Sequence, residues 1–191
     1  LAIGMYGHNV DFYDIKGAVD EIMEEMGSMD YDVTACAEGC PIEEYVAFHP
    51  GRSAIVTKGD TVLAIMGELH PETLENYEIG VKAYVAKLLI PEMMSVSVTE
   101  KTYKPLPKFP ATTRDLSVVC DDSITVASLE KAIKNAVGKI LEKVTLFDVY
   151  KGSQIAEGKK SVSFSISMRS MESTLTDEQA DAAMKRVLKA M

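Results

Sequence analysis

The sequence predicts an α+β protein with antiparallel sheets, arranged as two units along the chain. Three observations lead to this prediction. Residues 45–89 contain several short β-rich runs, preceded by one clear amphipathic helix. Residues 104–191 follow the order strand, helix, strand, strand, helix, and a proline-rich stretch separates the two patterns. At 191 residues the chain also exceeds the roughly 100 to 150 residues typical of one domain, which leaves room for two hydrophobic cores.

The first helix is expected from Asp14 to Met26, with Asp14 as its N-cap and Gly27 as the residue that ends it. Its apolar residues recur at helical spacing on one face: Ile15, Val19, Ile22 and Met26. Glutamates occupy the other face. Because the pattern indicates no pocket around them, we interpret them as a solvated surface rather than as an acid/base pair.

A group of β-rich runs follows: Tyr45 to Phe48, Ser53 to Thr57, Thr61 to Met66 and Val81 to Leu89. Lys58-Gly59-Asp60 is short enough to join the second and third runs as an antiparallel hairpin. Pro91 is expected to open a short apolar turn. Residues 103–110 then contain three prolines, which predicts a semi-rigid linker because proline continues neither a helix nor a central strand.

The second unit is expected to begin with a strand from Arg114 to Asp121, in which polar and apolar residues alternate. A helix from Val126 to Val137 follows it, with Thr125 as the N-cap. The next strand is expected from Lys143 to Tyr150, and a turn over residues 152–158 leads out of it.

Residues 161–169 alternate almost without a break, which predicts a strand with one buried and one wet face. The buried set is Val162, Phe164, Ile166 and Met168. Thr176 and Gln179 form a capping box at the start of the last helix. That helix has an apolar stripe: Ala180, Met184, Val187 and Leu188. The resulting order of elements is that of a ferredoxin-like unit.

Charge is divided unevenly between the two halves. Residues 1–100 contain 5 Lys and Arg against 18 Asp and Glu, whereas residues 101–191 contain 15 against 11. Because phosphate binding needs clustered cations, any contact with nucleic acid is expected in the second half. No apolar run approaches the roughly 18 residues of a membrane span, so we expect a cytoplasmic protein. The first residue is Leu1, which suggests a fragment of a longer chain.

The cysteines Cys36, Cys40 and Cys120 are expected to be reduced thiols, since an odd number forms no even disulfide framework. Cys36 and Cys40 could bind zinc together with His49, although a structural zinc site needs four ligands. We therefore expect no metal site. A hydrolase using His49 and Ser53 remains a further alternative, and no catalytic residue is assigned.

Several motifs occur in a fixed order along nearly the whole chain. They are Phe48-His-Pro-Gly-Arg-Ser-Ala54, Gly67-Glu-Leu-His-Pro71, Lys108-Phe-Pro-Ala111, Arg114-Asp-Leu-Ser117, Leu146-Phe-Asp-Val-Tyr-Lys-Gly152 and Thr174-Leu-Thr-Asp-Glu178. No single motif is specific, but the set resembles the C-terminal part of the β subunit of bacterial phenylalanyl-tRNA synthetase.

This resemblance implies a domain organisation and a function. Residues 1–100 would be the rear portion of a catalytic-like module, a class II synthetase-like antiparallel sheet that performs no aminoacylation. Residues 104–191 would be a ferredoxin-fold anticodon-binding domain. The fragment would bind the anticodon region of tRNA-Phe and support assembly with the synthetase α subunit into an (αβ)2 heterotetramer. ATP and Mg²⁺ would be bound elsewhere in the enzyme, and no cofactor is expected in this fragment.

The sequence departs from the family pattern at three places. A ferredoxin-like unit needs a fourth strand after its last helix, but the sequence ends at Met191 inside that helix, so the domain is expected to lack its last strand. Thr113 precedes Arg114 where the family often has two arginines, and Ser173 stands where it often has a basic residue. Fewer phosphate contacts are therefore expected. The upstream modules that carry editing are absent as well.

Alternation in the second unit places serines, Tyr150 and Arg169 on the open face of the predicted sheet, and the basic residues of this unit are candidates as a group. Serine hydroxyls can donate to phosphate or ribose oxygens, an exposed tyrosine can stack on a base, and lysines and arginines can pair with phosphates. The set is Arg114, Tyr150, Lys151, Lys159, Lys160, Ser163, Ser165, Ser167 and Arg169. Two alternatives stay open: an ordinary solvated sheet face, and a ferredoxin-like regulatory or protein-interaction domain that binds no RNA.

Overall fold

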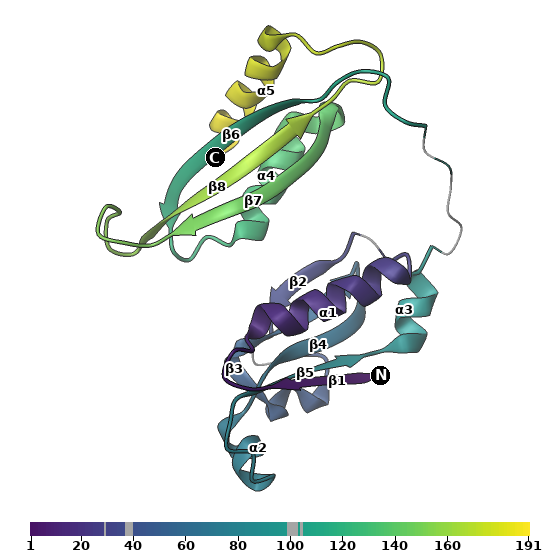
Figure 1. Ribbon diagram of the computed structural model, residues 1–191, viewed down its shortest axis with the longest axis vertical. Helices are drawn as coiled ribbons and strands as arrows, with labels where there is room; N and C mark the ends of the chain where they lie inside the picture. Colours follow the sequence, from purple (N-terminus) through teal and green to yellow (C-terminus); the bar gives the residue numbers. More distant parts are fainter. Residues whose placement is uncertain (29, 37–39, 99–102, 104) are drawn as a thin grey trace. The chain divides into compact units, whose positions relative to one another are not determined.

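The computed structural model describes residues 1–28, 30–36, 40–98, 103 and 105–191. The chain divides into two compact units, Leu1–Tyr103 and Lys104–Met191, each with its own core (Figure 1). Both units are α+β, and all strand pairs in them are antiparallel. None of the helices within the described residues is long and apolar enough to cross a membrane.

The first unit contains a five-stranded sheet in the order β1-β5-β4-β3-β2. Its strands are β1 (Ala2–Tyr6), β2 (Asp32–Ala35), β3 (Phe48–Lys58), β4 (Thr61–Leu69) and β5 (Ala83–Leu88). Its helices are α1 (Phe12–Glu25), the 3₁₀ helix η1 (Glu43–Ala47), α2 (Pro71–Asn76) and α3 (Ile90–Val96). The predicted hairpin at residues 58–60 is confirmed, because β3 and β4 pair up to Lys58 and Thr61.

Helices α1 and α3 pack on one face of this sheet. Ile15, Val19 and Met23 of α1 are fully buried there, together with Met93 of α3. A smaller cluster on the other face gathers around Ile65, where Phe48 and Cys36 are buried. The sheet is therefore covered on both faces near its centre.

The structure corrects several predictions in this unit. The N-cap of α1 is Asp11 rather than Asp14, because the Asp11 carboxylate accepts hydrogen bonds from the amides of Tyr13 and Asp14. Residues 45–47, expected in a strand, lie in η1. The turn expected at Pro91 is the helix α3, in which proline occupies the first turn, a position where its missing N–H costs no hydrogen bond. The short strands β1 and β2 were not predicted.

The second unit contains a three-stranded sheet in the order β6-β8-β7. Its elements are β6 (Thr112–Asp121), α4 (Val126–Val137), the 3₁₀ helix η2 (Gly138–Ile140), β7 (Leu141–Tyr150), β8 (Lys159–Met168) and α5 (Asp177–Ala190). Thr125 caps α4, and Thr176 with Gln179 forms the capping box of α5, as predicted. Of the predicted linker, Lys104 lies outside the described residues, and the rest contains no helix or strand.

Both helices of this unit pack on the same face of the sheet. The predicted buried set of β8 is confirmed, since Val162, Phe164, Ile166 and Met168 are all fully buried. They contact a layer of helical side chains that includes Ile133, Ala183 and Val187. Leu188 was expected in the apolar stripe of α5, but it is exposed; Ala183 is buried in the core instead. The opposite face of the sheet carries no helix (Figure 1).

Candidate nucleic-acid interface

The uncovered face of the β6-β8-β7 sheet, hereafter the open face, is organised in rows by the strand register. Ser163 lies between Ser117 and Asp148, and Ser165 lies between Asp115 and Thr145. Ser167 lies between Thr113 and Lys143, and Ser161 lies between Val119 and Tyr150. The serine hydroxyls of the central strand β8 therefore run along the middle of the open face, and side chains of β6 and β7 flank them.

The predicted serines lie together on the open face, but two of them already have protein partners. The hydroxyl oxygens of Ser117 and Ser163 are 2.8 Å apart, and Ser163 is 7% exposed. Ser167 donates to the Glu142 carboxylate at 2.9 Å. Ser165 is half-buried between its neighbours. A ligand that uses Ser163 or Ser167 has to share or replace these hydrogen bonds.

Tyr150 reaches the open face because β7 contains a register shift between Leu146 and Asp148. A β-bulge exposes one extra residue and reverses the alternation that follows it, so Asp148 and Tyr150 share a face with Thr145. Tyr150 is 39% exposed, and Phe147 at the shift is 57% exposed. The face therefore offers aromatic surface on which an unpaired base can stack.

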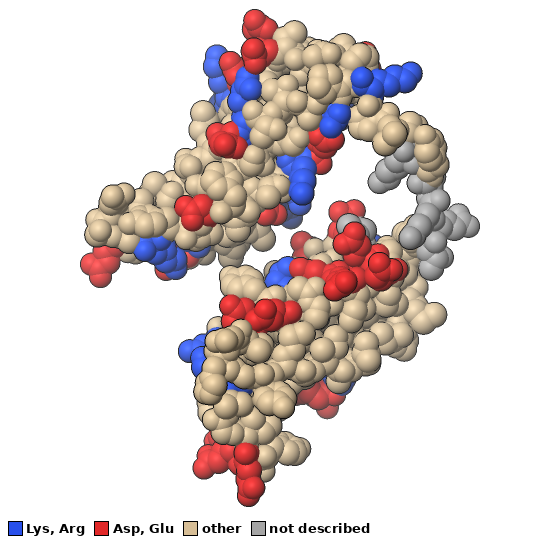
Figure 2. Space-filling model, in the orientation of Figure 1, with Lys and Arg blue, Asp and Glu red and all other residues tan. Residues whose placement is uncertain are grey.

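Each predicted basic residue forms an ion pair with an acid of the same unit. Arg114 contacts Asp177 at 2.6 Å and Asp181 at 3.4 Å, Lys151 contacts Asp122 at 2.5 Å, Lys159 contacts Asp121 at 2.8 Å, Lys160 contacts Asp122 at 3.9 Å, and Arg169 contacts Glu142 at 2.8 Å. Figure 2 shows Lys and Arg interspersed with Asp and Glu over this unit, whereas acidic side chains gather over α1 of the first unit. The predicted cations of the second unit are thus engaged with acids rather than gathered in a purely basic patch.

Two of these residues do not face the open side. Arg114 pairs in register with Ile166, so its side chain projects toward the helices, where it contacts α5. Lys160 also lies on the helix side; it is 8% exposed, and its Nζ donates to the main-chain carbonyl of Asp122 at 2.9 Å. Arg114 and Lys160 thus lie on the helix side of the sheet, away from the serine rows, and their contact with RNA stays a prediction.

Arg169 is half-buried beside the open face rather than free in solvent. Its Nη1 donates to the carbonyl of Phe109 at 2.5 Å, and its Nε donates to Glu142. The hydrogen bonds from Arg169 and Ser167 hold the pKa of the Glu142 carboxyl below its usual range. In the same way, Lys151 lowers the pKa of Asp122. These carboxylates stay ionised at neutral pH and compete with any phosphate for the neighbouring cations.

Sequence reasoning missed one residue of the open face. Lys143 lies in the row of Thr113 and Ser167, it is exposed, and no ion pair joins it to any other residue that the structure describes. Strict alternation along the predicted strand from Lys143 to Tyr150 puts these two residues on opposite faces, and only the register shift between Leu146 and Asp148 brings both to the open face.

The hydrolase and zinc alternatives gain no support from the geometry. Ser53 Oγ donates to the main-chain carbonyl of His49 at 3.0 Å, while His49 Nδ1 accepts from the Gly51 amide at 3.1 Å. Within the described ranges, no group of three or more His, Cys, Asp or Glu side chains could hold a metal ion. Burial, together with a hydrogen bond with Cys40, raises the pKa of the Cys36 thiol to about 12, so this thiol is protonated and unreactive at neutral pH.

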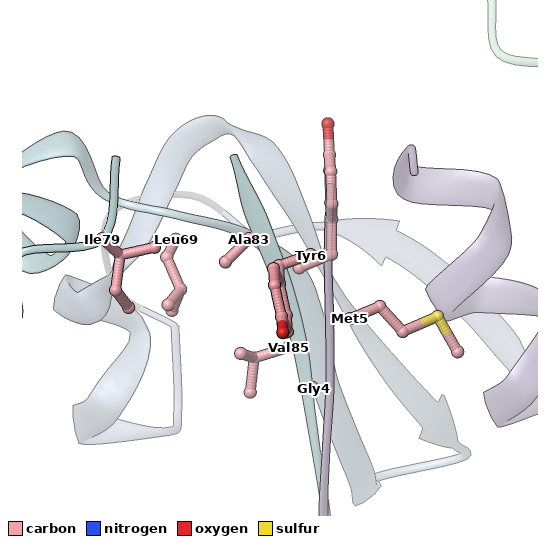
Figure 3. Close-up of a pocket in the computed structure, with 8 residues that line it drawn as sticks. Gly4, Met5, Tyr6, Leu69, Ile79, Ala83 and Val85 are labelled. Atoms are coloured by element: carbon pink, nitrogen blue, oxygen red, sulfur yellow. The ribbon is translucent and has the colours of Figure 1, made fainter. Parts of the chain in front are cut away.

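The first unit holds two features that the sequence did not reveal. A buried carboxylate, Glu68, accepts two hydrogen bonds from Arg52 Nη1 at 3.0 and 3.1 Å and one from the Tyr84 hydroxyl at 3.3 Å. A pocket of about 340 Å³ lies beside β1 and β5, where Tyr6, Leu69 and Ile79 contribute side chains (Figure 3). Its lining is almost entirely apolar, so it offers contact surface rather than reactive groups.

Comparison with known proteins agrees with this division of the chain. Residues 1–90 match the family model of the phenylalanyl tRNA synthetase beta chain CLM domain. Residues 107–191 match the model of the ferredoxin-fold anticodon binding domain. The boundary between the two compact units falls in residues 91–106, which lie between the two matches.

Individual relatives align with all or nearly all of the chain. It is 40% identical over 191 residues to the phenylalanine–tRNA ligase β subunits of Clostridium acetobutylicum and Clostridium tetani, with 100% of this chain and 23% of each relative aligned. It is 38% identical over 181 residues to that of Symbiobacterium thermophilum, with 95% of this chain and 20% of the relative aligned. The chain thus spans less than a quarter of the length of these curated relatives.

Proposed function

We infer the function from the families of the two parts of the chain: residues 1–90 belong to that of the phenylalanyl-tRNA synthetase β-chain CLM domain, and residues 107–191 belong to that of the ferredoxin-fold anticodon-binding domain. From this premise we propose that the open face binds the anticodon stem and loop of tRNA-Phe. The observation that carries the proposal is that the serines of β8, the exposed Tyr150 and Lys143, which forms no ion pair with another described residue, share one uncovered sheet face. Bases would stack on Tyr150, and Lys143 and the serine hydroxyls would contact phosphate and ribose.

The role of the first unit follows from its family. Its proposed role is to support assembly with the synthetase α subunit into an (αβ)2 heterotetramer in the cytoplasm. The joining of phenylalanine to tRNA, with ATP and Mg²⁺, is assigned to other parts of the enzyme. The apolar pocket and the exposed aromatic side chains of Tyr6 and Tyr77 are surfaces suited to protein contact rather than to chemistry.

One observation favours the second candidate, a protein-interaction domain without RNA. The five predicted cations are each matched by an acid within the unit, which lowers the attraction for a polyanion. Salt dependence separates the two functions. RNA binding through phosphates weakens as salt rises, with a slope in log K of roughly −0.7 per phosphate neutralised on a single strand.

The combination Tyr150→Ala with Lys143→Ala tests the proposed face. The loss of stacking alone should lower RNA affinity by about 5-fold to 150-fold. The loss of the lysine should reduce the slope of log K against log salt concentration by about one. Because both side chains are exposed, the free energy of unfolding should change by no more than about 0.5 kcal/mol each. Fluorescence titration with a labelled RNA hairpin of the tRNA-Phe anticodon stem and loop measures the affinity, and thermal melting checks the fold.

Lys131→Ala is the matched control, because Lys131 is an exposed lysine of α4 on the opposite side of the sheet. It should leave the affinity and the salt slope nearly unchanged. A loss of affinity from Lys131→Ala as large as that from the double variant would mean that the open face is not the RNA surface.

Glu142→Gln should act in the opposite direction. The substitution removes a negative charge beside the serine row and releases Arg169 and Ser167. Because one negative charge is removed and Arg169 becomes available to a phosphate, we expect RNA affinity to rise. Lowering the pH protonates Glu142 and should likewise release Arg169 for RNA. The pKa of Glu142 is depressed in the folded chain, so the stabilisation that its ion pair gives to the fold is present above the unfolded pKa and is lost as the pH falls through the folded pKa. Unchanged or weaker binding by Glu142→Gln at neutral pH would exclude Arg169 from the interface.

A further inference from the structure

Gly152 lies directly against the side chain of Tyr150. A Cβ atom placed on Gly152 would be 2.6 Å from Cζ and 3.1 Å from Cε2 of the Tyr150 ring. Favourable contacts between carbon atoms occur at about 3.5 to 4.0 Å, so any other residue at position 152 would collide with the ring where it now lies. The space that a side chain would fill is occupied by the ring of Tyr150.

The local backbone explains this arrangement. Residues two apart in an extended chain project to the same side, so the ring of Tyr150, the last residue of β7, extends over Gly152. Gly152 then opens a turn that is closed by a hydrogen bond from the Ile155 amide to the Gly152 carbonyl at 2.9 Å. Its φ lies outside the left-handed range, unlike that of Gly158 at +78°. Gly152 is therefore needed at this position because it has no side chain, and not because of its backbone conformation.

The turn itself is tied to the neighbouring loop. Lys151 pairs with Asp122 at 2.5 Å, and the Asp122 amide donates to the Gly158 carbonyl at 2.9 Å. Both contacts join the segment around Gly152 to the end of β6. The backbone against which the ring lies is held from both sides.

We propose that Gly152 is a positioning residue that seats the ring of Tyr150 for stacking on an RNA base. This inference rests on the proposed function of the open face. The hydroxyl end and one edge of the ring occupy the space that a side chain at Gly152 would fill, and Tyr150 remains partly exposed toward solvent. A ring fixed in this way loses less rotational freedom when a base stacks on it than a freely rotating side chain would.

The test is a double-mutant cycle in the full 191-residue chain with Tyr150→Ala, Gly152→Ala and the combination of both. The probe is the RNA hairpin of the tRNA-Phe anticodon stem and loop. Tyr150→Ala should weaken binding by about 5-fold to 150-fold, and Gly152→Ala should reproduce a large part of that loss. Adding Gly152→Ala to Tyr150→Ala should cause no further loss, because the ring that Gly152 seats is already absent.

Gly80→Ala is the matched control, since no atom lies within 4 Å of a Cβ at that position and its φ is also outside the left-handed range. It should leave affinity unchanged. NMR spectra of the tyrosine rings supply a second measurement that does not depend on RNA. Gly152→Ala should shift the Tyr150 ring signals, and Gly80→Ala should not.

The outcomes separate this inference from the proposed function. If Tyr150→Ala weakens binding while Gly152→Ala does not, the positioning role is wrong and the RNA-binding face stands. The positioning role is also wrong if Gly152→Ala weakens binding equally with and without Tyr150. If Tyr150→Ala itself has no effect, the stacking function fails, and the role of Gly152 in it fails with it.

Discussion

Phe164→Ala should destabilise the second unit by about 3 to 5 kcal/mol, the cost typical of removing a buried aromatic ring. Phe164 is 0% exposed and lies on the central strand β8, in register with Leu116 of β6 and Leu146 of β7. The ring packs in the core that the sheet shares with Ile133 and Val187. The second unit would lose a large part of its stability, since single domains commonly have only about 5 to 15 kcal/mol.

Differential scanning calorimetry measures this effect, with Phe147→Ala as the matched control. Phe147 is the exposed phenylalanine of the same sheet, and its removal should change the free energy of unfolding by no more than about 0.5 kcal/mol. The transition of the first unit should not move in either variant, because its cores contain no residue of the second unit. A larger loss from Phe147→Ala than from Phe164→Ala would mean that the faces of β7 and β8 are assigned the wrong way round.

Gly67→Ala should destabilise the first unit by about 2 to 6 kcal/mol, because strain and overpacking add together. Gly67 is buried in β4 at a φ of +155°, a conformation that residues with a side chain rarely adopt. A Cβ there would lie 2.6 Å from Ser53 Cα and 2.8 Å from Ser53 Cβ, beside the register shift in β3. The colliding atoms belong to or adjoin the main chain, so a simple rotamer change cannot relieve the clash.

Gly80→Ala serves as the control for this variant too. It adds the same methyl group at an exposed position with open space around it, and it should leave the stability unchanged or raise it by up to about 1 kcal/mol. Chemical denaturation of the two variants compares them directly. Equal stability of Gly67→Ala and the parent chain would show that β3 can shift away from β4 at little cost.

The extent to which sequence predicted this fold varies with the local signal. Capping residues gave the starts of α4 and α5, because Thr125 and Thr176 bind amides only a few residues away. The buried face of β8 was predictable as well, because alternation also depends only on residues close together in the sequence. By contrast, β1 and β2 contain five and four residues, too few for a pattern to stand out, and both lie at the edges of the sheet.

The candidate site was predictable in its polar rows but not in its charges. Local alternation placed Ser163 and Ser165 on one face, and the strand register confirms that placement. The ion pairs that engage the predicted cations join residues far apart in sequence, such as Arg114 with Asp177 and Lys159 with Asp121. Only the tertiary arrangement brings such partners together, and composition alone therefore overestimated the positive charge available to RNA.

The central claim is that RNA contacts the open face, and an NMR titration of the isotope-labelled 191-residue chain with the tRNA-Phe anticodon hairpin tests it most directly. The account predicts that the largest shift changes occur along the serine rows, at Ser165, Ser167, Lys143 and Tyr150. The helical side carries exposed cations of its own, at Lys131, Lys185 and Lys189. Shift changes concentrated at these three lysines, with the serine rows unaffected, would contradict the account.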